Sequence, residues 1–278
     1  MQNLTPNVFV ETGYYPTVSF VVTVAGVVAV DSPMNPPDAV AWAKAIASKG
    51  ELRYLINAEH HADHILGDPF LGGTLISSEW TRDHFLDSVR STENARQMLR
   101  QRSPESACFA EAYELRWPDV TYRERMTLRL GGTTFRLIQS PGHTRGQTIV
   151  HVVEERVAIT ADNIVHGAPP FFHAAALWSW FESLAMLESL DVDWYVPGHG
   201  TPCKKEWIPR LRGIMLGIVD EVRRAKGQGL SREEAQEKIR YIDRPGFSFP
   251  DYLAPRLREL QVLGIGNIYD QLGEHPAG

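Results

Sequence analysis

Apolar residues in the first two thirds of the chain are grouped in short runs that predict β-strands. Residues 18–24 and 27–30 are rich in valine and flank the turn Ala25-Gly26, which is the pattern of a β-hairpin. Further runs of strand length, bounded by glycine or polar residues, are segments 52–56, 74–76, 126–130, 133–138, 148–153, 157–160 and 194–196. We expect these runs to form the sheets of the fold.

Helical spacing of apolar residues separates these strands and dominates the end of the chain. The segments with this spacing are 38–48, 79–102, 179–190, 208–224, 232–240 and 252–271. Strands that alternate with helices indicate an α/β fold. We therefore predict one α/β domain over residues 1–202 and a helical C-terminal extension, residues 203–278, packed on the same domain. The leucine and isoleucine spacing of residues 252–271 fits either a cap over a cleft or a homodimer surface.

Composition narrows the classes of partner. The 278 residues are 43% hydrophobic and carry a formal net charge of −6, which disfavours a nucleic-acid partner because phosphate binding needs clustered lysine and arginine. The longest apolar stretch, residues 18–30, is too short to cross a bilayer, so no membrane partner is expected. Two cysteines outside any C-x-x-C pair, and an N-terminus without a signal-peptide pattern, favour a cytoplasmic protein.

The densest group of chemically active side chains follows the predicted strand at residues 52–56. Residues 57–64 read NAEHHADH, with three histidines and two acids in six consecutive positions. Imidazole and carboxylate groups together at the end of a strand are typical ligands of a divalent cation. In an extended loop, positions 59, 61 and 63 face the same way, and His64 turns inward where a helix begins. A metal-binding loop explains this pattern better than a solvated polar loop.

Three later positions place one candidate ligand each just beyond a predicted strand. They are His143 and His199, each at the end of a Pro-Gly-His tripeptide, and Asp162. Glycine and proline let the backbone bend sharply at the edge of a sheet, where open sheets place their binding sites. One Pro-Gly-His would be weak evidence, whereas two of them in a fixed order with the acid-rich loop are a strong indication of a metal centre.

This ordered set of motifs resembles that of the metallo-β-lactamase superfamily. The five motifs of the family are matched by Asp31, residues 59–64, His143, Asp162 and His199, and the resemblance spans residues 8–202. It implies a four-layer αββα sandwich with two divalent metal ions in a cleft at the sheet edges, followed here by the C-terminal helices.

The resemblance also implies a role for each residue. One ion would be bound by Glu59, His61 and His143, the other by Asp63, His64 and His199, with Asp162 bridging both. Asp31 would steady the ligand loop, although an aspartate that merely ends a strand before a Ser-Pro turn explains it equally well. The implied enzyme is a hydrolase whose metal-bound hydroxide attacks an ester, lactone, thioester or amide of a small molecule. Asp63 would orient that nucleophile or accept its proton.

Glu59 departs from the family pattern, in which the second motif begins with histidine, as His-x-His-x-Asp-His. A glutamate makes the first site richer in oxygen and shifts its preference from zinc, the usual ion of the family, toward manganese or iron. A weak first site with only one bound ion, at Asp63, His64 and His199, is the other possibility. In zinc β-lactamases that have a cysteine ligand, this cysteine lies near the position that Asp162 occupies here. Because the residue is an aspartate in this chain, antibiotic hydrolysis is not favoured.

Aromatic and histidine side chains near these motifs are candidates for substrate contacts. His166 and His173 flank the loop segment 169–172 (PPFF) soon after Asp162, and His166 is the proposed contact. Tyr14, Phe171, Phe172 and Trp178 are expected to form an apolar pocket for a small, partly hydrophobic substrate. Ordinary packing under the C-terminal helices is the alternative.

Three other functions remain open. Glu59, His61 and His143 would suit the iron of a 2-His-1-carboxylate oxygenase, as in some relatives on this fold. A nuclease, an activity found in some members of the superfamily, is disfavoured by the negative charge and by the lack of a large inserted domain between His143 and His199. A non-catalytic ligand sensor would have no reason to keep the full ligand set. The identity of the substrate does not follow from the fold, because this fold hosts many chemistries.

Overall fold

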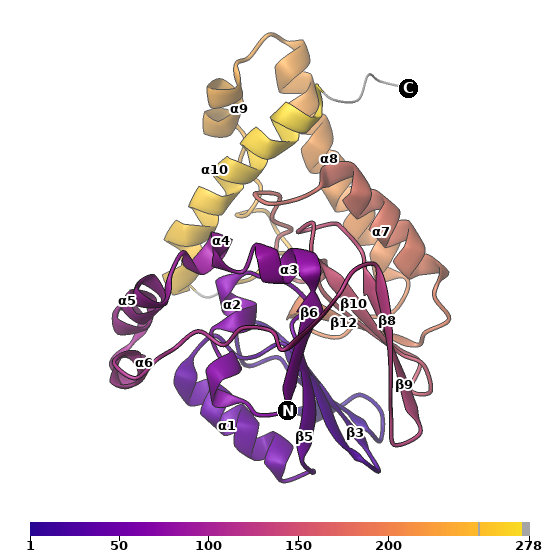
Figure 1. Cartoon of the computed structure of the whole chain (residues 1–278). Coiled ribbons are helices and arrows are strands. Elements are labelled where there is room, and N and C mark those ends of the chain that lie inside the picture. Colours follow the sequence, from indigo (N-terminus) through magenta and orange to yellow (C-terminus); the bar gives the residue numbers. More distant parts are fainter. Residues whose placement is uncertain (250, 274–278) are drawn as a thin grey trace.

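Two β-sheets pack face to face between layers of helices in the computed structural model, which describes residues 1–249 and 251–273 (Figure 1). Apolar side chains from both sheets, among them Val28, Ile56, Phe135 and Val150, fill the space between them. This is the packing of a sandwich of aligned sheets. The predicted four-layer αββα architecture is confirmed.

The first sheet contains seven strands in sequential order, antiparallel from β1 to β4 and parallel from β4 to β7. They are β1 Gln2–Asn3, β2 Val8–Glu11, β3 Val18–Thr23, β4 Gly26–Val30, β5 Leu52–Ile56, β6 Thr74–Ser78 and β7 Val120–Tyr122. The hairpin of β3 and β4 is confirmed, and Gly26 adopts a φ of 122° in its turn, a conformation that favours glycine. The sequence prediction missed β1, β2 and β7, which are only two to four residues long.

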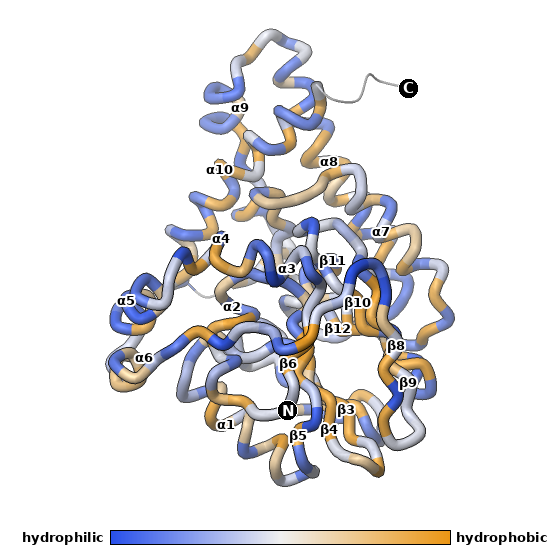
Figure 2. The backbone as a smooth tube through the Cα atoms, viewed as in Figure 1, coloured by the Kyte–Doolittle hydropathy of each residue, from blue (hydrophilic) through white to orange (hydrophobic). Residues whose placement is uncertain are grey.

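The central strands β3 and β4 of the first sheet are mostly buried on both faces, which explains their nearly continuous apolar sequence. Val21 and Val28 point into the space between the sheets, whereas their neighbours Phe20 and Ala29 pack on the other face against helix α1, Pro36–Ala47. Figure 2 shows the hydrophobic colour concentrated along these strands. The helix covers the sheet with the buried side chain of Trp42.

The second sheet has five strands in the order β12-β11-β10-β9-β8. They are β8 Arg125–Leu130, β9 Thr133–Gln139, β10 Thr148–Val152, β11 Val157–His166 and β12 Trp194–Gly200. β11 and β12 run parallel, with register shifts between Ile159 and Ala161 and between Ala161 and Val165. Both strands extend beyond the ends predicted at residues 160 and 196. Asp162 and His199 therefore lie inside irregular strand segments and not after the strands, as the sequence had indicated.

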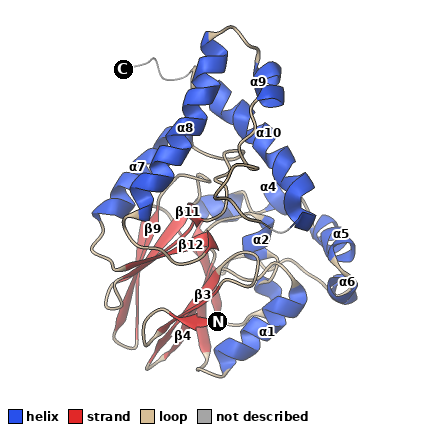
Figure 3. Ribbon diagram, turned by 180° about the vertical axis from the view of Figure 1, so that it is seen from behind, coloured by secondary structure: helices blue, strands red, loops and turns tan. Residues whose placement is uncertain are grey.

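Helices α7, Leu177–Ser189, and α8, Trp207–Gly227, cover the outer face of the second sheet (Figure 3). The remaining C-terminal helices, α9 Arg232–Lys238 and α10 Ala254–Gln271, share one apolar core with α7, α8 and this sheet. Cys203 forms an isolated β-bridge with Tyr195 of β12, so the segment between β12 and α8 is attached to the sheet. Residues 274–278 of the predicted extension lie outside the described residues.

Segment 79–102, expected to be mainly helical, is divided into three short helices. They are α3 Glu79–Asp83, α4 Leu86–Val89 and α5 Thr92–Arg102. Arg90 interrupts the last two with a φ of 62°, and Ser91 begins α5 by accepting a hydrogen bond from the Asn94 backbone. A further helix, α6 Pro104–Ala110, was not predicted. Within the described residues, no helix combines the length and the apolar character needed to cross a bilayer.

Candidate metal centre

The acid-rich loop leaves the end of β5 in an extended conformation and then enters the short helix α2, Ala62–Ile65. His61 precedes this helix with extended backbone angles, so Glu59 and His61 face the same side. The helix then turns Asp63 and His64 toward that side. His60 faces away and packs against the Trp80 ring, with centroids 5.2 Å apart. Burial lowers its pKa to about 3, and it takes no part in the cluster.

Asp31 holds the loop from behind. Its Oδ1 accepts a hydrogen bond from the Ala58 backbone at 2.7 Å, and its Oδ2 accepts one from His64 Nδ1 at 2.8 Å. With Nδ1 as the donor, His64 keeps its Nε2 free to bind a cation. Asp31 itself adopts a φ of 58° at the end of β4, a conformation that aspartate tolerates better than most residues.

His143 is positioned by the loop that contains it and by Asn163. The His143 backbone donates to Asn163 Oδ1 at 2.9 Å, and a Cβ at Gly142 would lie only 2.0 Å from the same oxygen. The glycine of this Pro-Gly-His therefore permits a close approach that no other residue allows. His143 Nδ1 donates to the Phe171 carbonyl at 2.8 Å, which leaves Nε2 directed into the cluster.

Asp162 and His199 meet where β11 and β12 lose their regular register. Ala161 has a φ of 40°, which turns the backbone just before Asp162. A Cβ at Gly198 would lie 1.8 Å from Asp162 Oδ1, so the second Pro-Gly-His also needs its glycine for close contact. His199 Nε2 lies 3.4 Å from Asp162 Oδ2 and 3.3 Å from Asp63 Oδ2.

All seven predicted ligands converge on one cluster. Within the cluster, Asp162 lies between His64 and His143. Its Oδ1 is 3.5 Å from His64 Nε2, and its Oδ2 is 3.5 Å from His143 Nε2. Glu59 is completely buried, and its Oε1 lies 3.4 Å from His64 Nε2. Donor atoms on a tetrahedral zinc ion are about 3.3 Å apart, given bond lengths of about 2.0–2.1 Å. The spacing of these atoms therefore fits metal coordination.

Unsatisfied buried atoms support the same interpretation. Glu59 Oε1, His64 Nε2 and Asp162 Oδ1 are buried and form no hydrogen bond within the described chain. Buried polar atoms without a partner are costly unless something else binds them, and a cation would satisfy these three at once. The donor set of carboxylates and imidazoles therefore fits divalent metal ions.

The electrostatics of the cluster also favour positive charge. Burial disfavours the charged forms, yet the nearby imidazoles of His199 and His64 hold the pKa of Asp162 well below its usual range. In turn, Asp162 and Asp63 outweigh burial and raise the pKa of His199 to about 10. The buried carboxylates thus stabilise cations placed among them.

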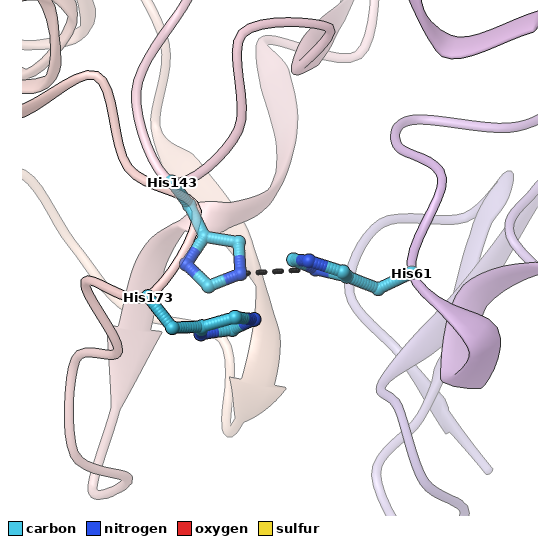
Figure 4. Close-up of side chains that lie close together, drawn as sticks. All are labelled: His61, His143 and His173. Atoms are coloured by element: carbon cyan, nitrogen blue, oxygen red, sulfur yellow. Dashed lines mark hydrogen bonds between the residues drawn. The ribbon is translucent and has the colours of Figure 1, made fainter. Parts of the chain in front are cut away.

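His173 joins this cluster, although its place in the sequence, after the PPFF segment, predicts no role for it. One ligand atom from each of His61, His143 and His173 lies within 4.8 Å of the others, and two further such groups are Asp63, His64 and His199, and Glu59, His64 and Asp162. Figure 4 shows His143 and His173 approaching His61 from the opposite side. His173 follows the conspicuous PPFF segment, but no spacing rule links it to the other motifs.

A cavity of about 650 Å³ reaches the cluster at His199. Three of the expected substrate contacts, Tyr14, His166 and Phe171, line it. Other parts of its wall are Tyr15, whose ring centroid lies 4.3 Å from that of His199, and Leu257 of α10. The C-terminal extension therefore contributes to the cavity, although the sequence left this role undecided.

Phe172 and Trp178 lie elsewhere, which corrects their expected place in the pocket. Phe172 has no exposed surface and packs against Trp180 and Tyr241. Trp178 packs in α7 against the core beneath the C-terminal helices. Successive residues of the extended PPFF segment point in opposite directions, so Phe171 faces the cavity while Phe172 enters the core.

Comparisons with known proteins agree with this geometry. A hydroxyacylglutathione hydrolase from Cereibacter sphaeroides is 26% identical over 161 residues, which cover 57% of this chain and 52% of the relative. The chain thus spans about half the length of the curated relatives it matches.

Solved structures share the fold at low sequence identity. A metallo-beta-lactamase family protein from Thermus thermophilus superposes with a TM-score of 0.70 at 17% identity, covering 98% of this chain and 95% of that one. The sec-alkylsulfatase Pisa1 from Pseudomonas sp. gives 0.66 at 13% identity, with 97% and 49% covered. The family profile of the metallo-beta-lactamase superfamily matches residues 12–199, which contain all seven candidate ligands, and the chain belongs to this superfamily.

Proposed function

We propose that the protein is a metal-dependent hydrolase of small molecules with two divalent metal ions. The observation that carries the proposal is the convergence of seven acidic and imidazole ligands beside a cavity of about 650 Å³. Hydroxyacylglutathione hydrolase and a sec-alkylsulfatase are among the similar proteins, and both names denote hydrolysis. An ester, thioester, lactone or amide is the proposed substrate class.

The ligands divide into two groups that share Asp162. Glu59, His61 and His143 would hold one ion, and Asp63, His64 and His199 the other. Bound metal ions would supply a water of lowered pKa and would polarise a substrate oxygen. Zinc is the first choice, and the carboxylate of Glu59 also admits manganese or iron.

Asp63 is the proposed catalytic carboxylate. Its side chain is 19% exposed, whereas that of Glu59 has no exposed surface, so Asp63 is the more accessible of the two to water and substrate. An ionised carboxylate at this place orients an attacking water and accepts its proton. Burial disfavours the charged form of Asp63, but His64 and His199 outweigh burial and hold its pKa below the usual range, which maintains the ionised form at neutral pH.

The cavity walls indicate a substrate with both apolar and polar parts. Phe171, Phe249 and Leu257 supply apolar surface, and Asn35 and Asp38 supply polar groups. We propose that Tyr14 and Phe171 contact the apolar part of the substrate. His166, whose Nδ1 donates to the Thr201 carbonyl at 2.8 Å, would present its other face to a substrate.

The test is an activity screen of the purified full chain loaded separately with Zn²⁺ and Mn²⁺. Lactones, thioesters, aryl esters, alkyl sulfates, phosphodiesters and β-lactams are compared before and after chelation. Hydrolysis of one class that chelation abolishes and Asp63→Asn lowers at least about a hundredfold supports the proposal. Oxygen uptake by iron-containing protein without hydrolysis would instead identify an oxygenase.

A further inference from the structure

We infer that His173 is a third imidazole ligand of the first metal ion, together with His61 and His143. Glu59 stands where the family has a histidine, and His173 supplies the missing imidazole from another loop. This inference rests on the proposed metal centre and concerns which residues complete it.

The geometry brings the three rings together from two sides of the cleft. The His173 ring centroid lies 4.9 Å from that of His61 and 5.5 Å from that of His143. His61 Nδ1 and His143 Nε2 are 3.2 Å apart, and the ring of His173 lies next to both (Figure 4). Ligand atoms of all three lie within 4.8 Å of one another, so a small movement of the rings would bring them around one ion.

His173 also has an unsatisfied polar atom. Its Nδ1 is buried and has no hydrogen-bond partner among the described residues. His166, at the end of β11, is different because its Nδ1 bonds to Thr201. A buried imidazole nitrogen without a partner costs free energy, and a metal ion would compensate for this cost.

Glu59 lies between the two groups of proposed ligands, and its shortest contact with them is that of Oε2 with His61 Nδ1, at 2.6 Å. It forms a compact group with His64 and Asp162, and its Oε1 lies 3.4 Å from His64 Nε2 and 3.9 Å from His143 Nε2. The carboxylate thus faces both groups of ligands. With His173 in place, the first site keeps three imidazoles, the preferred ligands of zinc, and gains a nearby negative charge.

The loop that carries His173 is held in place by the C-terminal helix α10. Asn267 Nδ2 donates to the carbonyls of Phe172 at 2.6 Å and Ala175 at 2.9 Å. Gln271 Nε2 donates to the Ala175 carbonyl at 2.8 Å. These bonds fix the backbone on both sides of His173, as a preorganised ligand requires.

The experiment compares metal binding by the wild-type chain, His173→Ala and the matched control His166→Ala. Each protein is loaded with Zn²⁺ and dialysed, and its bound zinc is measured by inductively coupled plasma mass spectrometry. Affinity is measured by competition with a chromophoric chelator. We expect His173→Ala to lose one ion per chain or to bind it at least about tenfold more weakly, while His166→Ala matches the wild type. Added free imidazole should restore the lost ion.

Cobalt substitution gives a second readout that does not depend on activity. The visible spectrum of the Co²⁺-loaded protein should change in His173→Ala and remain unchanged in His166→Ala. If His173→Ala does not fold, as judged by circular dichroism, His173→Gln replaces it and should show the same loss.

Zinc content, affinity and cobalt spectrum equal to the wild type in the His173 variant would overturn the inference. This outcome is distinct from failure of the proposed function, which would show itself as a wild-type chain that binds no metal or hydrolyses nothing. The ratio of the zinc affinities of the variant and the wild type tests whether His173 is a ligand. Metal binding and hydrolysis by the wild-type protein alone test the proposed function.

Discussion

Asp31 and His64 form a buried pair in which the carboxylate Oδ2 accepts a hydrogen bond from Nδ1 at 2.8 Å. The other oxygen of Asp31 accepts from the Ala58 backbone, so one side chain orients both the ligand and its loop. An asparagine that keeps the bond to Ala58 would direct its amide group at His64 Nδ1. This would favour the tautomer with a proton on Nε2, which cannot bind a metal.

Asp31→Asn should therefore lower the affinity for the second ion by about 10- to 100-fold. The expected change is a weaker zinc affinity in chelator competition, with a circular dichroism spectrum like that of the wild type. Equal affinity in the two proteins would show that Asp31 merely ends a strand.

Glu59→His introduces the histidine with which the His-x-His-x-Asp-His motif, resembled by this loop, begins. Replacing a carboxylate by an imidazole should raise the preference for zinc over manganese by about tenfold, because imidazole suits zinc whereas carboxylates suit harder ions. The measurement is the ratio of Zn²⁺ to Mn²⁺ affinity in both proteins under the same conditions. An unchanged ratio would mean that the Glu59 carboxylate does not contact a metal ion.

Gly198→Ala should disrupt the centre, since the added Cβ would lie 1.8 Å from Asp162 Oδ1 and 2.7 Å from the Ala161 backbone. We expect loss of bound metal and a destabilisation of about 1–3 kcal/mol from this overpacking. Gly213→Ala in α8 is the control, because nothing lies within 4 Å of its Cβ. That variant should keep its metal and its melting temperature or gain stability. The same effect in both variants would contradict the packing argument.

Asn267→Ala tests whether α10 positions the His173 loop. Removal of two hydrogen bonds to this loop, each worth about 1 kcal/mol, should lower the affinity for the first zinc ion by about tenfold or more. Gln236→Ala is matched to it, because Gln236 bonds to the carbonyl of Val262 on the same helix, at 2.8 Å, but does not bond to the His173 loop. Similar zinc affinities for these two variants would show that α10 does not act on the metal centre.

Asp68 makes stability depend on pH. Burial raises its pKa to about 8, although Ser32 and Asn57 donate hydrogen bonds to its Oδ1. The unfolded chain ionises this group near 3.8, so the folded state binds the extra proton between these values. The contribution to stability is complete below pH 4, falls as the pH rises, and is lost above pH 8.

Asp68→Asn should remove this dependence. When the pH rises from about 5.5 to about 8.5, the free energy of unfolding of the variant should increase by about 2 kcal/mol or more relative to that of the wild type. The reason is that one pKa unit corresponds to about 1.4 kcal/mol. Urea unfolding of the metal-loaded proteins at the two pH values gives the difference. Parallel changes in both proteins would mean that Asp68 is already ionised in the folded state.

The sequence by itself determined the α/β class, most of the strands and the seven candidate ligands. Apolar spacing reflects local burial, and Glu59, His61, Asp63 and His64 lie so close together along the chain that their shared orientation follows from local backbone geometry. The two Pro-Gly-His tripeptides were recognisable as sequence motifs, but the need for their glycines comes from tertiary contacts. Gly142 and Gly198 meet Asn163 and Asp162 so closely that no larger residue fits.

Only the tertiary structure decided the neighbours that come from distant segments. His173 reaches His61 because α10, almost a hundred residues further along, holds its loop through Asn267. Phe171 lies in the cavity and Phe172 in the core. Composition cannot reveal which of two adjacent phenylalanines points into the cavity. The physical reason is that such contacts depend on long-range packing, which is determined only when the whole chain is folded.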